Sequence, residues 1–172
     1  MPLLDPGAPL SDPATGLPFD VTSGSFYITV SDDTTSTPVA YRIDVDLSGD
    51  GADTTLNALV QDINDNVAGL TASLTSDNRL TLTSDEGSSF VFGYDGQSAR
   101  SDTSGVLAAM GLNTFFTGTD AGSIAVSEAL VANSSYLAAA AENQSGDGVV
   151  AGRIANLDVA SVTPDGQRSI PE

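Results

Sequence analysis

The chain's 172 residues suffice for one domain or one and a half with a real core, and its 23 acidic side chains against five basic ones give a net charge of −18. This charge excludes nucleic acids as partners and disfavours anionic membrane surfaces, because both require cationic groups on the protein. The absence of Cys and His removes thiol nucleophiles, disulfides, Cys/His zinc sites and imidazole acid–base catalysis.

Prolines are concentrated at the start of the chain. Residues 1–20 hold five of the eight, at positions 2, 6, 9, 13 and 18. Proline fixes φ and removes a backbone donor, so this composition favours extended chain. We therefore expect an extended, Pro-rich lead-in and interpret it as a linker.

Two strands and a helix are expected next. Apolar residues alternate with polar ones in residues 26–30 and again in residues 39–47, the period of half-buried strands, and we expect the two strands to form an antiparallel hairpin. The period then changes to that of a helix over residues 56–67. Asp53 or Thr54 is expected to cap this helix, and Gly69 to stop it.

The remaining elements are shorter. Strands are predicted at residues 70–75, at residues 80–83, and on one face formed by Phe90, Phe92 and Tyr94. A helix near residues 106–110, capped by Thr103 or Ser104 and closed by Gly111, should precede strands at 113–117 and 124–126. An Ala-rich stretch at 135–141 is weakly helical, and residues 153–157 could begin a further helix.

This order of elements predicts an α+β fold, a mostly antiparallel β-sheet with two or three short helices packed on one face. Three segments follow from it: the lead-in at residues 1–20, an α+β domain at residues 21–142, and a Gly-rich, polar exit segment at residues 143–172.

An acidic stretch at residues 44–55 is the strongest candidate for a ligand site. Asp44, Asp46, Ser48 and Gly49 fit positions one, three, five and six of an EF-hand calcium loop. Position twelve is Thr55, which lacks the bidentate carboxylate, and a strand precedes the loop where the motif expects a helix. The favoured interpretation is an acidic turn leading into a helix N-terminus.

We therefore predict no metal site. The weak candidate ligands, should a low-affinity calcium site exist here, are Asp44, Asp46, Ser48 and Asp50.

The chain is not expected to be an enzyme, and its sequence indicates no cofactor. Nucleophilic hydrolysis needs a base beside the Ser or Thr, and the chain has no His, no Lys and no Gly-x-Ser-x-Gly elbow. The segment 146–148 lacks the Lys and the Ser or Thr of a phosphate loop. Glycoside hydrolysis by a pair of carboxylates is not excluded, because two carboxylates that are distant in the sequence can meet in the fold.

Two stretches carry a family resemblance. Residues 104–120 with 124–126 (SGVLAAMGLNTFFTGTD and IAV) and residues 41–56 (YRIDVDLSGDGADTTL) resemble the central, outer region of the flagellar hook-associated protein 1 family. The resemblance extends over about residues 24–157. Terminal helices that form an axial coiled-coil core flank this region in the family. Their heptads are absent here, so the resemblance implies an excised middle portion whose exit segment leads toward a missing axial helical region.

The resemblance implies a structural component of the bacterial flagellum, a hook–filament junction subunit domain that supports filament attachment, assembly and motility. It implies an extracellular location after export without a cleaved signal peptide. The implied partners are neighbouring copies and the adjoining hook and filament axial proteins, with no enzymatic activity or cofactor.

Without the axial helices, and with the self-repulsion of its charge, the isolated fragment is expected to be monomeric. The alternatives are an extracellular calcium-binding adhesion or surface module, and a carbohydrate-active domain.

Overall fold

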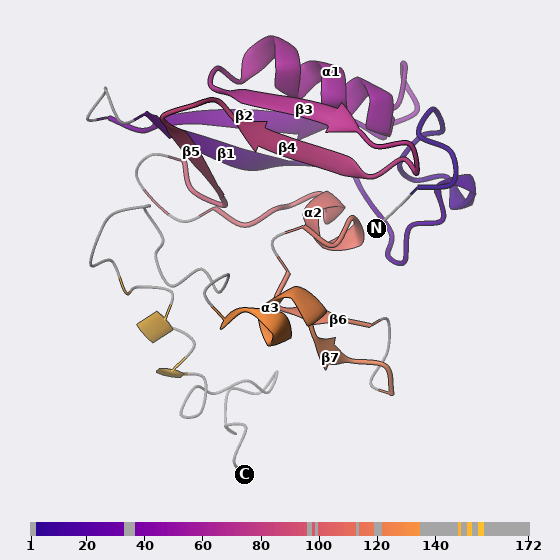
Figure 1. The fold of residues 1–172 in the computed structure, drawn as a ribbon. Coiled ribbons are helices and arrows are strands. Elements are labelled where there is room, and N and C mark those ends of the chain that lie inside the picture. Colours follow the sequence, from indigo (N-terminus) through magenta and orange to yellow (C-terminus); the bar gives the residue numbers. More distant parts are fainter. Residues whose placement is uncertain are drawn as a thin grey trace.

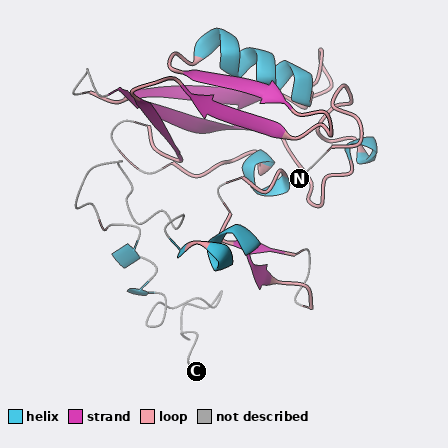
Figure 2. Cartoon of the chain, viewed as in Figure 1, coloured by secondary structure: helices cyan, strands magenta, loops and turns pink. Residues whose placement is uncertain are grey.

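A computed structural model describes residues 3–32, 37–95, 98, 100–112, 114–118, 122–134, 148, 151–152 and 155–156. These residues form an α+β fold in which every ladder between named strands is antiparallel, as the sequence predicts (Figures 1 and 2). In Figure 1, helix α1 lies above the strands, whereas the short helix α2 lies below them.

The central sheet has three strands in the order β2-β1-β5: β1 (Gly24–Asp32), β2 (Val39–Val45) and β5 (Ser88–Phe92). The predicted hairpin of β1 and β2 is confirmed. Ile28 lies opposite Tyr41 on one side and Phe92 on the other, which places the apolar positions of all three strands on the same face.

Helix α1 (Leu56–Asn66) covers that apolar face. Its buried residues are Leu56, Leu59 and Ile63, whose spacing of three and four places them on one side of the helix. They belong to the same buried cluster as Ile28 and Ile43 of the sheet. The cluster is the core of the fold.

The N-cap of α1 differs from the expected residue. The hydroxyl of Thr55 accepts the Ala58 N–H at 3.1 Å, so Thr55 is the cap. The expected residues have other roles, since the carboxylate of Asp53 accepts the Gly49 N–H at 2.9 Å and the hydroxyl of Thr54 accepts the Asp46 N–H at 2.9 Å. Both stabilise the preceding loop rather than the helix.

A second hairpin, β3 (Leu70–Leu74) and β4 (Leu80–Ser84), packs beside α1. The side-chain amide of Asn64 on α1 joins the two, because it donates to the Ala72 carbonyl at 2.9 Å and accepts the Ala72 N–H at 2.7 Å. Between the helix and β3 the chain turns at Gly69, where φ is 78°. The helix itself ends earlier, with Val67 as its C-cap in an extended conformation, so Gly69 forms the turn into β3 and does not stop the helix as expected.

The Pro-rich segment is part of the core rather than a linker exposed to solvent. Leu3 and Leu10 are buried, with exposures of 3% and 2%. The Leu3 N–H donates to the Asn78 carbonyl at 3.2 Å, and the Leu10 N–H donates to the Thr54 carbonyl at 2.9 Å. A 3₁₀ turn, η1 (Pro13–Thr15), interrupts the segment. Leu3 and Leu10 belong to no helical or strand periodicity, so no sequence pattern predicts their burial.

Strand β5 ends earlier than predicted. Gly93 follows it with a φ of 76°, so Tyr94 does not continue the face formed by Phe90 and Phe92. The Tyr94 carbonyl instead accepts a hydrogen bond from the Thr29 hydroxyl at 2.6 Å. Thr29 is 1% exposed, so β1 is covered on its second face as well.

Helix α2 (Val106–Ala109) is held mainly by Asp102, which was not expected. Ser104, one of the two expected cap residues, contributes as well, because its hydroxyl accepts the Val106 N–H at 3.3 Å. The Asp102 carboxylate accepts the N–H groups of Gly105 at 3.1 Å and Leu107 at 2.9 Å, at the positive end of the helix. The expected closing glycine, Gly111, follows the helix with a φ of 72°.

The segment before α2 lies beside the start of β1. The hydroxyl of Thr103 accepts the Ser25 N–H at 2.9 Å, the Thr103 N–H donates to the Ser25 carbonyl at 3.0 Å, and the Thr22 N–H donates to the Ser104 carbonyl at 3.0 Å. A side chain at Gly24 would place its Cβ 2.7 Å from the Thr103 carbonyl carbon, so only glycine permits this approach.

The last described elements are β6 (Phe116–Thr117), β7 (Ala125–Val126) and α3 (Glu128–Ala132). The two strands pair with each other and lie within the predicted ranges 113–117 and 124–126, but both are shorter than predicted. Helix α3 was not predicted. The expected helix at 135–141 lies outside the described residues, as does most of the one at 153–157. None of the helices in the described ranges combines the length and apolar content needed to cross a bilayer.

We expect Leu10→Ala to lower the free energy of unfolding by about 2–5 kcal/mol, because it removes a buried side chain and leaves a cavity. Leu4→Ala is the matched control in the same segment, since Leu4 is 79% exposed, and it should change stability by less than about 0.5 kcal/mol. Urea unfolding followed by circular dichroism measures both. Equal effects of the two substitutions would contradict a core role for this segment.

Candidate functional site

The acidic loop joins β2 to α1 and is closed by its own backbone and side chains. The Thr54 N–H donates to the Asp46 carbonyl at 2.7 Å, across the base of the loop. Inside it, the Asp46 carboxylate accepts the Ser48 N–H at 3.0 Å. Such a bond from an aspartate to the residue two positions on is a common turn-forming contact.

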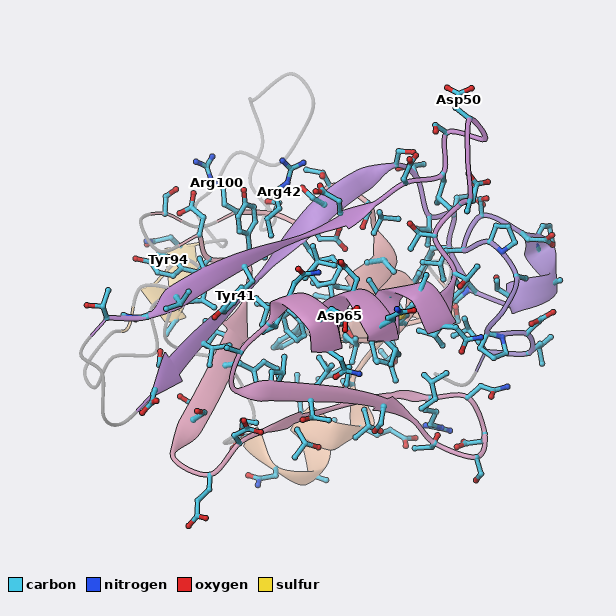
Figure 3. All side chains as sticks on the ribbon, turned by 90° about the horizontal axis from the view of Figure 1, so that it is seen from above. Tyr41, Arg42, Asp50, Asp65, Tyr94 and Arg100 are labelled. Carbon is cyan, nitrogen blue, oxygen red and sulfur yellow. The ribbon has the colours of Figure 1, made fainter. Side chains whose placement is uncertain are left out.

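The structure does not bring the four candidate ligands of this loop together. Asp44 lies on β2, where its carboxylate forms an ion pair with Arg42 at 2.7 Å. Asp46 and Ser48 contact each other, and Asp50 lies at the exposed tip of the loop (Figure 3). Within the described ranges, no group of three or more acidic side chains is arranged to hold a metal ion.

The loop therefore has the geometry of an acidic turn before a helix, the interpretation that the sequence favours. The calcium-binding alternative has no support.

Hydrogen bonds lower the pKa of two loop carboxyl groups. The Ser48 side chain, and then its backbone N–H, lower the pKa of Asp46 below its ordinary value. In the turn between β3 and β4, the Thr75 hydroxyl and then Arg79 lower the pKa of Asp77. Both groups are at the surface, so the shifts reflect local turn geometry rather than a buried reactive site.

Each arginine in the described part of the chain pairs with a nearby aspartate. The pairs are Arg42–Asp44 at 2.7 Å, Arg79–Asp77 at 2.7 Å and Arg100–Asp95 at 2.5 Å. Asp95 also raises the pKa of Arg100. Each of these positive charges is thus offset by a neighbouring carboxylate.

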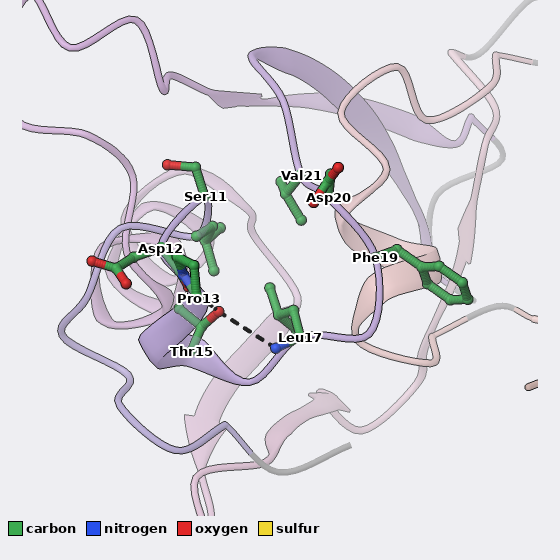
Figure 4. A pocket seen from close by; sticks show the side chains of 9 residues that line it. Ser11, Asp12, Pro13, Thr15, Leu17, Phe19, Asp20 and Val21 are labelled. Carbon is green, nitrogen blue, oxygen red and sulfur yellow. Dashed lines mark hydrogen bonds between the residues drawn. The ribbon is translucent and has the colours of Figure 1, made fainter. Parts of the chain in front are cut away.

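A hollow of about 350 Å³ lies along the N-terminal segment (Figure 4). Its polar groups make local backbone contacts: the Asp12 carboxylate accepts the Ala14 N–H at 2.8 Å, and the Thr15 hydroxyl donates to the Asp12 carbonyl at 2.7 Å. Figure 4 shows Asp12 and Asp20 on opposite sides, with carboxylates that do not point toward each other. The converging carboxylates of a glycosidase are not found in this hollow.

A second hollow, of about 420 Å³, lies between β2 and α1. It is bordered by the Arg42–Asp44 ion pair and by Asp62, whose carboxylate accepts the Asn66 side-chain N–H at 2.7 Å. These polar groups are also paired with near neighbours along the chain. The arrangement offers no nucleophile with an adjacent base.

Apolar side chains are exposed on β6, β7 and α3 and on the residues just before the two strands, and we call them the β6–β7–α3 surface. Sequence reasoning missed this surface. Its residues are Phe115, Phe116, Ile124, Val126 and Val131, with exposures of 37%, 57%, 60%, 39% and 75%.

The hairpin sets the arrangement of this surface. Phe116 lies opposite Val126 in the β6–β7 register, and the rings of Phe115 and Phe116 meet edge to face with centroids 4.7 Å apart. Gly118 approaches the backbone at Ser123 so closely that a Cβ would clash. The only charged residue among the described residues from 114 to 134 is Glu128. This surface suits contact with another apolar surface.

Residues 25–86 match the family model of the Flagellin hook IN motif. The matched range contains β2, α1, β3, β4 and all of β1 except Gly24, and thus most of the core and the acidic loop. No curated protein matches the chain. The motif supports a flagellar structural component with an extracellular location, in a class of proteins that assemble with neighbouring subunits.

We expect the melting temperature to fall as the pH drops from about 5 to about 2, in part because of Asp46. A lowered pKa in the folded state stabilises the fold above the ordinary pKa, and this stabilisation is lost as acid protonates the group. Asp46→Asn should lower the melting temperature at neutral pH and flatten the acid dependence. Asp50→Asn is the control for the loss of one carboxylate from this loop. An unchanged acid slope in Asp46→Asn would be inconsistent with the assignment.

We also expect calcium to leave the melting temperature unchanged. A ligand that binds the folded state must raise it, by an amount that grows with concentration. Calorimetric scans of the metal-stripped chain test this, with and without calcium at about 10 mM, which exceeds the dissociation constants of about 10⁻⁴–10⁻³ M of weak extracellular sites. Magnesium is the control for ionic strength. A calcium-specific rise would restore the binding alternative.

Proposed function

We propose that the chain is a subunit domain of the junction between the flagellar hook and its filament, where it supports filament attachment and assembly. The observation that carries the proposal is the match of residues 25–86 to a hook motif of flagellin-type proteins. The motif supports a flagellar structural role, and the position at the junction is our inference beyond it.

The geometry of the described residues supports a mechanical role. The core is continuous from the N-terminal segment through the sheet, α1 and α2. Every buried side-chain polar atom of the described part has a hydrogen-bond partner. Such a core resists local opening, as a part that transmits force requires.

The chemistry of the surface supports a protein that is not an enzyme. The polar groups that border the two hollows form bonds with near neighbours in the sequence. Catalysis needs an acid, a base or a nucleophile that converge on a common point. We infer that the work of this chain is contact with other subunits.

The junction, rather than another part of the flagellum, is supported by a stretch outside the matched range. Residues 104–126 carry the resemblance to hook-associated protein 1 described above, and they include α2, β6 and β7. We therefore propose an outer domain that includes the buried N-terminal segment and extends to residue 142, followed by an exit segment at residues 143–172. We also propose contacts with neighbouring copies and with hook and filament axial proteins. The proposed location is extracellular, after export without a cleaved signal peptide.

Immunogold labelling of intact flagella tests the junction. Antibodies raised against this chain should label a single narrow zone where the hook meets the filament. A strain lacking the gene for the full protein is the control for specificity. Labelling along the whole filament or the whole hook would overturn the junction role, while it would leave the chain a flagellar component.

Deletion of residues 3–112 from the full protein tests the supporting role. It removes the shared core as a unit, from Leu3 to Met110, so that no half of this core is left exposed. We expect hooks to form, with fewer of them bearing filaments and more filament subunits shed into the medium. Secretion of the shortened protein must be shown by immunoblot. Normal filament attachment with the shortened protein present would contradict the role.

A further inference from the structure

Four Asp–Gly pairs occur in the sequence, at residues 50–51, 95–96, 147–148 and 165–166. Such a pair can isomerise without an enzyme, because glycine has no side chain to keep its amide nitrogen away from the preceding carboxyl group. The structure describes both members of the first pair, and the aspartate of the second. Whether each pair reacts depends on how freely its carboxyl group and its amide nitrogen can meet.

The two reacting groups of the first pair are free. Asp50 lies at the tip of the acidic loop and projects away from the fold (Figure 3). Within the described ranges, no hydrogen bond or ion pair holds its carboxylate, and the Gly51 amide nitrogen has no acceptor. A Cβ built on Gly51 would meet no described atom within 4 Å, so the backbone has room to turn this nitrogen toward the Asp50 side chain.

The carboxylate of the second pair is held from two directions. One oxygen of Asp95 accepts the Ser98 N–H at 2.7 Å, and the other pairs with Nε of Arg100 at 2.5 Å. The Asp95 side chain is only 14% exposed. A carboxylate bound in this way must leave charged and polar partners and gain a proton before it can react. The two pairs thus share their chemistry and differ in their surroundings.

We propose that the bond between Asp50 and Gly51 is a site of spontaneous isomerisation in the folded chain, and that Asp95 is protected from the same reaction. The Gly51 nitrogen attacks Cγ of the protonated Asp50 side chain. The new C–N bond closes a five-membered succinimide ring, and the carboxyl hydroxyl leaves with the amide proton as water.

Water then opens the ring in one of two ways. When it adds at the former main-chain carbonyl of Asp50 and breaks the bond from that carbon to nitrogen, the chain continues through the side chain and the product is isoaspartate. When it adds at Cγ, aspartate is restored. One water leaves and one returns, so the isomer has the same mass, and the reaction needs no oxidant or reductant.

The position of the pair lets the folded chain accept the product. Isoaspartate inserts one methylene carbon into the main chain. The base of the loop is closed by the Thr54 N–H, which donates to the Asp46 carbonyl at 2.7 Å, and the buried residues of α1 lie beyond it. The extra length is taken up between residues 46 and 54, so no loss of core packing opposes the change.

Incubation of the full 172-residue chain at a pH of about 6, where a small fraction of ordinary aspartate carboxyl groups is protonated, tests the proposal. Peptide mapping with electron-transfer fragmentation distinguishes the two isomers and measures isoaspartate at each position. We expect it to form at residue 50 at least about ten-fold faster than at residue 95, because only the second carboxylate must first break charge-assisted bonds. In guanidinium chloride, where these bonds are lost, the two rates should become similar.

Two substitutions test the two halves of the proposal separately. Gly51→Ala puts a methyl group beside the attacking nitrogen and should slow the reaction at residue 50 at least about ten-fold. Alanine fits there, because the position is open and its φ is not left-handed. Arg100→Gln removes the ion pair of Asp95 and should speed the reaction at residue 95, while residue 50 keeps its rate.

Equal rates at residues 50 and 95 in the folded chain would overturn the proposal, as would a folded chain that forms no isoaspartate at residue 50 while the unfolded chain does. An unchanged rate at residue 95 in folded Arg100→Gln would overturn the protection by the ion pair. Circular dichroism checks the fold of each variant. The comparison of the folded and unfolded original chain needs no substitution, so it decides the proposal even if a variant fails to fold.

Discussion

The register of β1 between β2 and β5 is the constraint on which the rest of the fold depends. Ile28, which is fully buried, lies opposite Tyr41 and Phe92, so three strands contribute to one apolar face. A slip of one residue would move this apolar set to the opposite face of the sheet and bring the alternate set against α1. Thr29, on the other face, fixes the same register, because its hydroxyl is buried and needs the Tyr94 carbonyl as its acceptor.

Features that depend on local period could be predicted from the sequence, and features that depend on distant partners could not. The strand alternation around Ile28 and the helical spacing of Leu56, Leu59 and Ile63 each signal one buried face within a few residues. The burial of Leu10 depends on Thr54, more than forty positions away, and no local pattern reports it. The prediction of the α1 cap failed for another reason. A shift of one position in the start of a helix changes which residue is the cap, and Asp53, Thr54 and Thr55 are adjacent.

The two candidate sites show the same limit of sequence reasoning: it suggested one site that the structure does not form, and it missed a surface that the structure has. Motif spacing suggested that the carboxylates of residues 44–50 could converge, but strand alternation and the pairing of Arg42 with Asp44 keep Asp44 out of the loop. The β6–β7–α3 surface was missed because apolar alternation tells which side of a strand is apolar and not what covers it. A low density of charge across residues 103–141 of a strongly acidic chain was the signal that could have found it.

The bonds between Ser25 and Thr103 have a consequence for how such a protein can change in evolution. They hold β1 against the segment that follows β5, and Gly24 allows the close contact of the two backbones. The residues between them begin and end at neighbouring points of the chain. Insertions in the exposed loops of this segment therefore leave the spacing of the flanking chain unchanged, so the domain can grow in bulk without a change in the distance between its two ends.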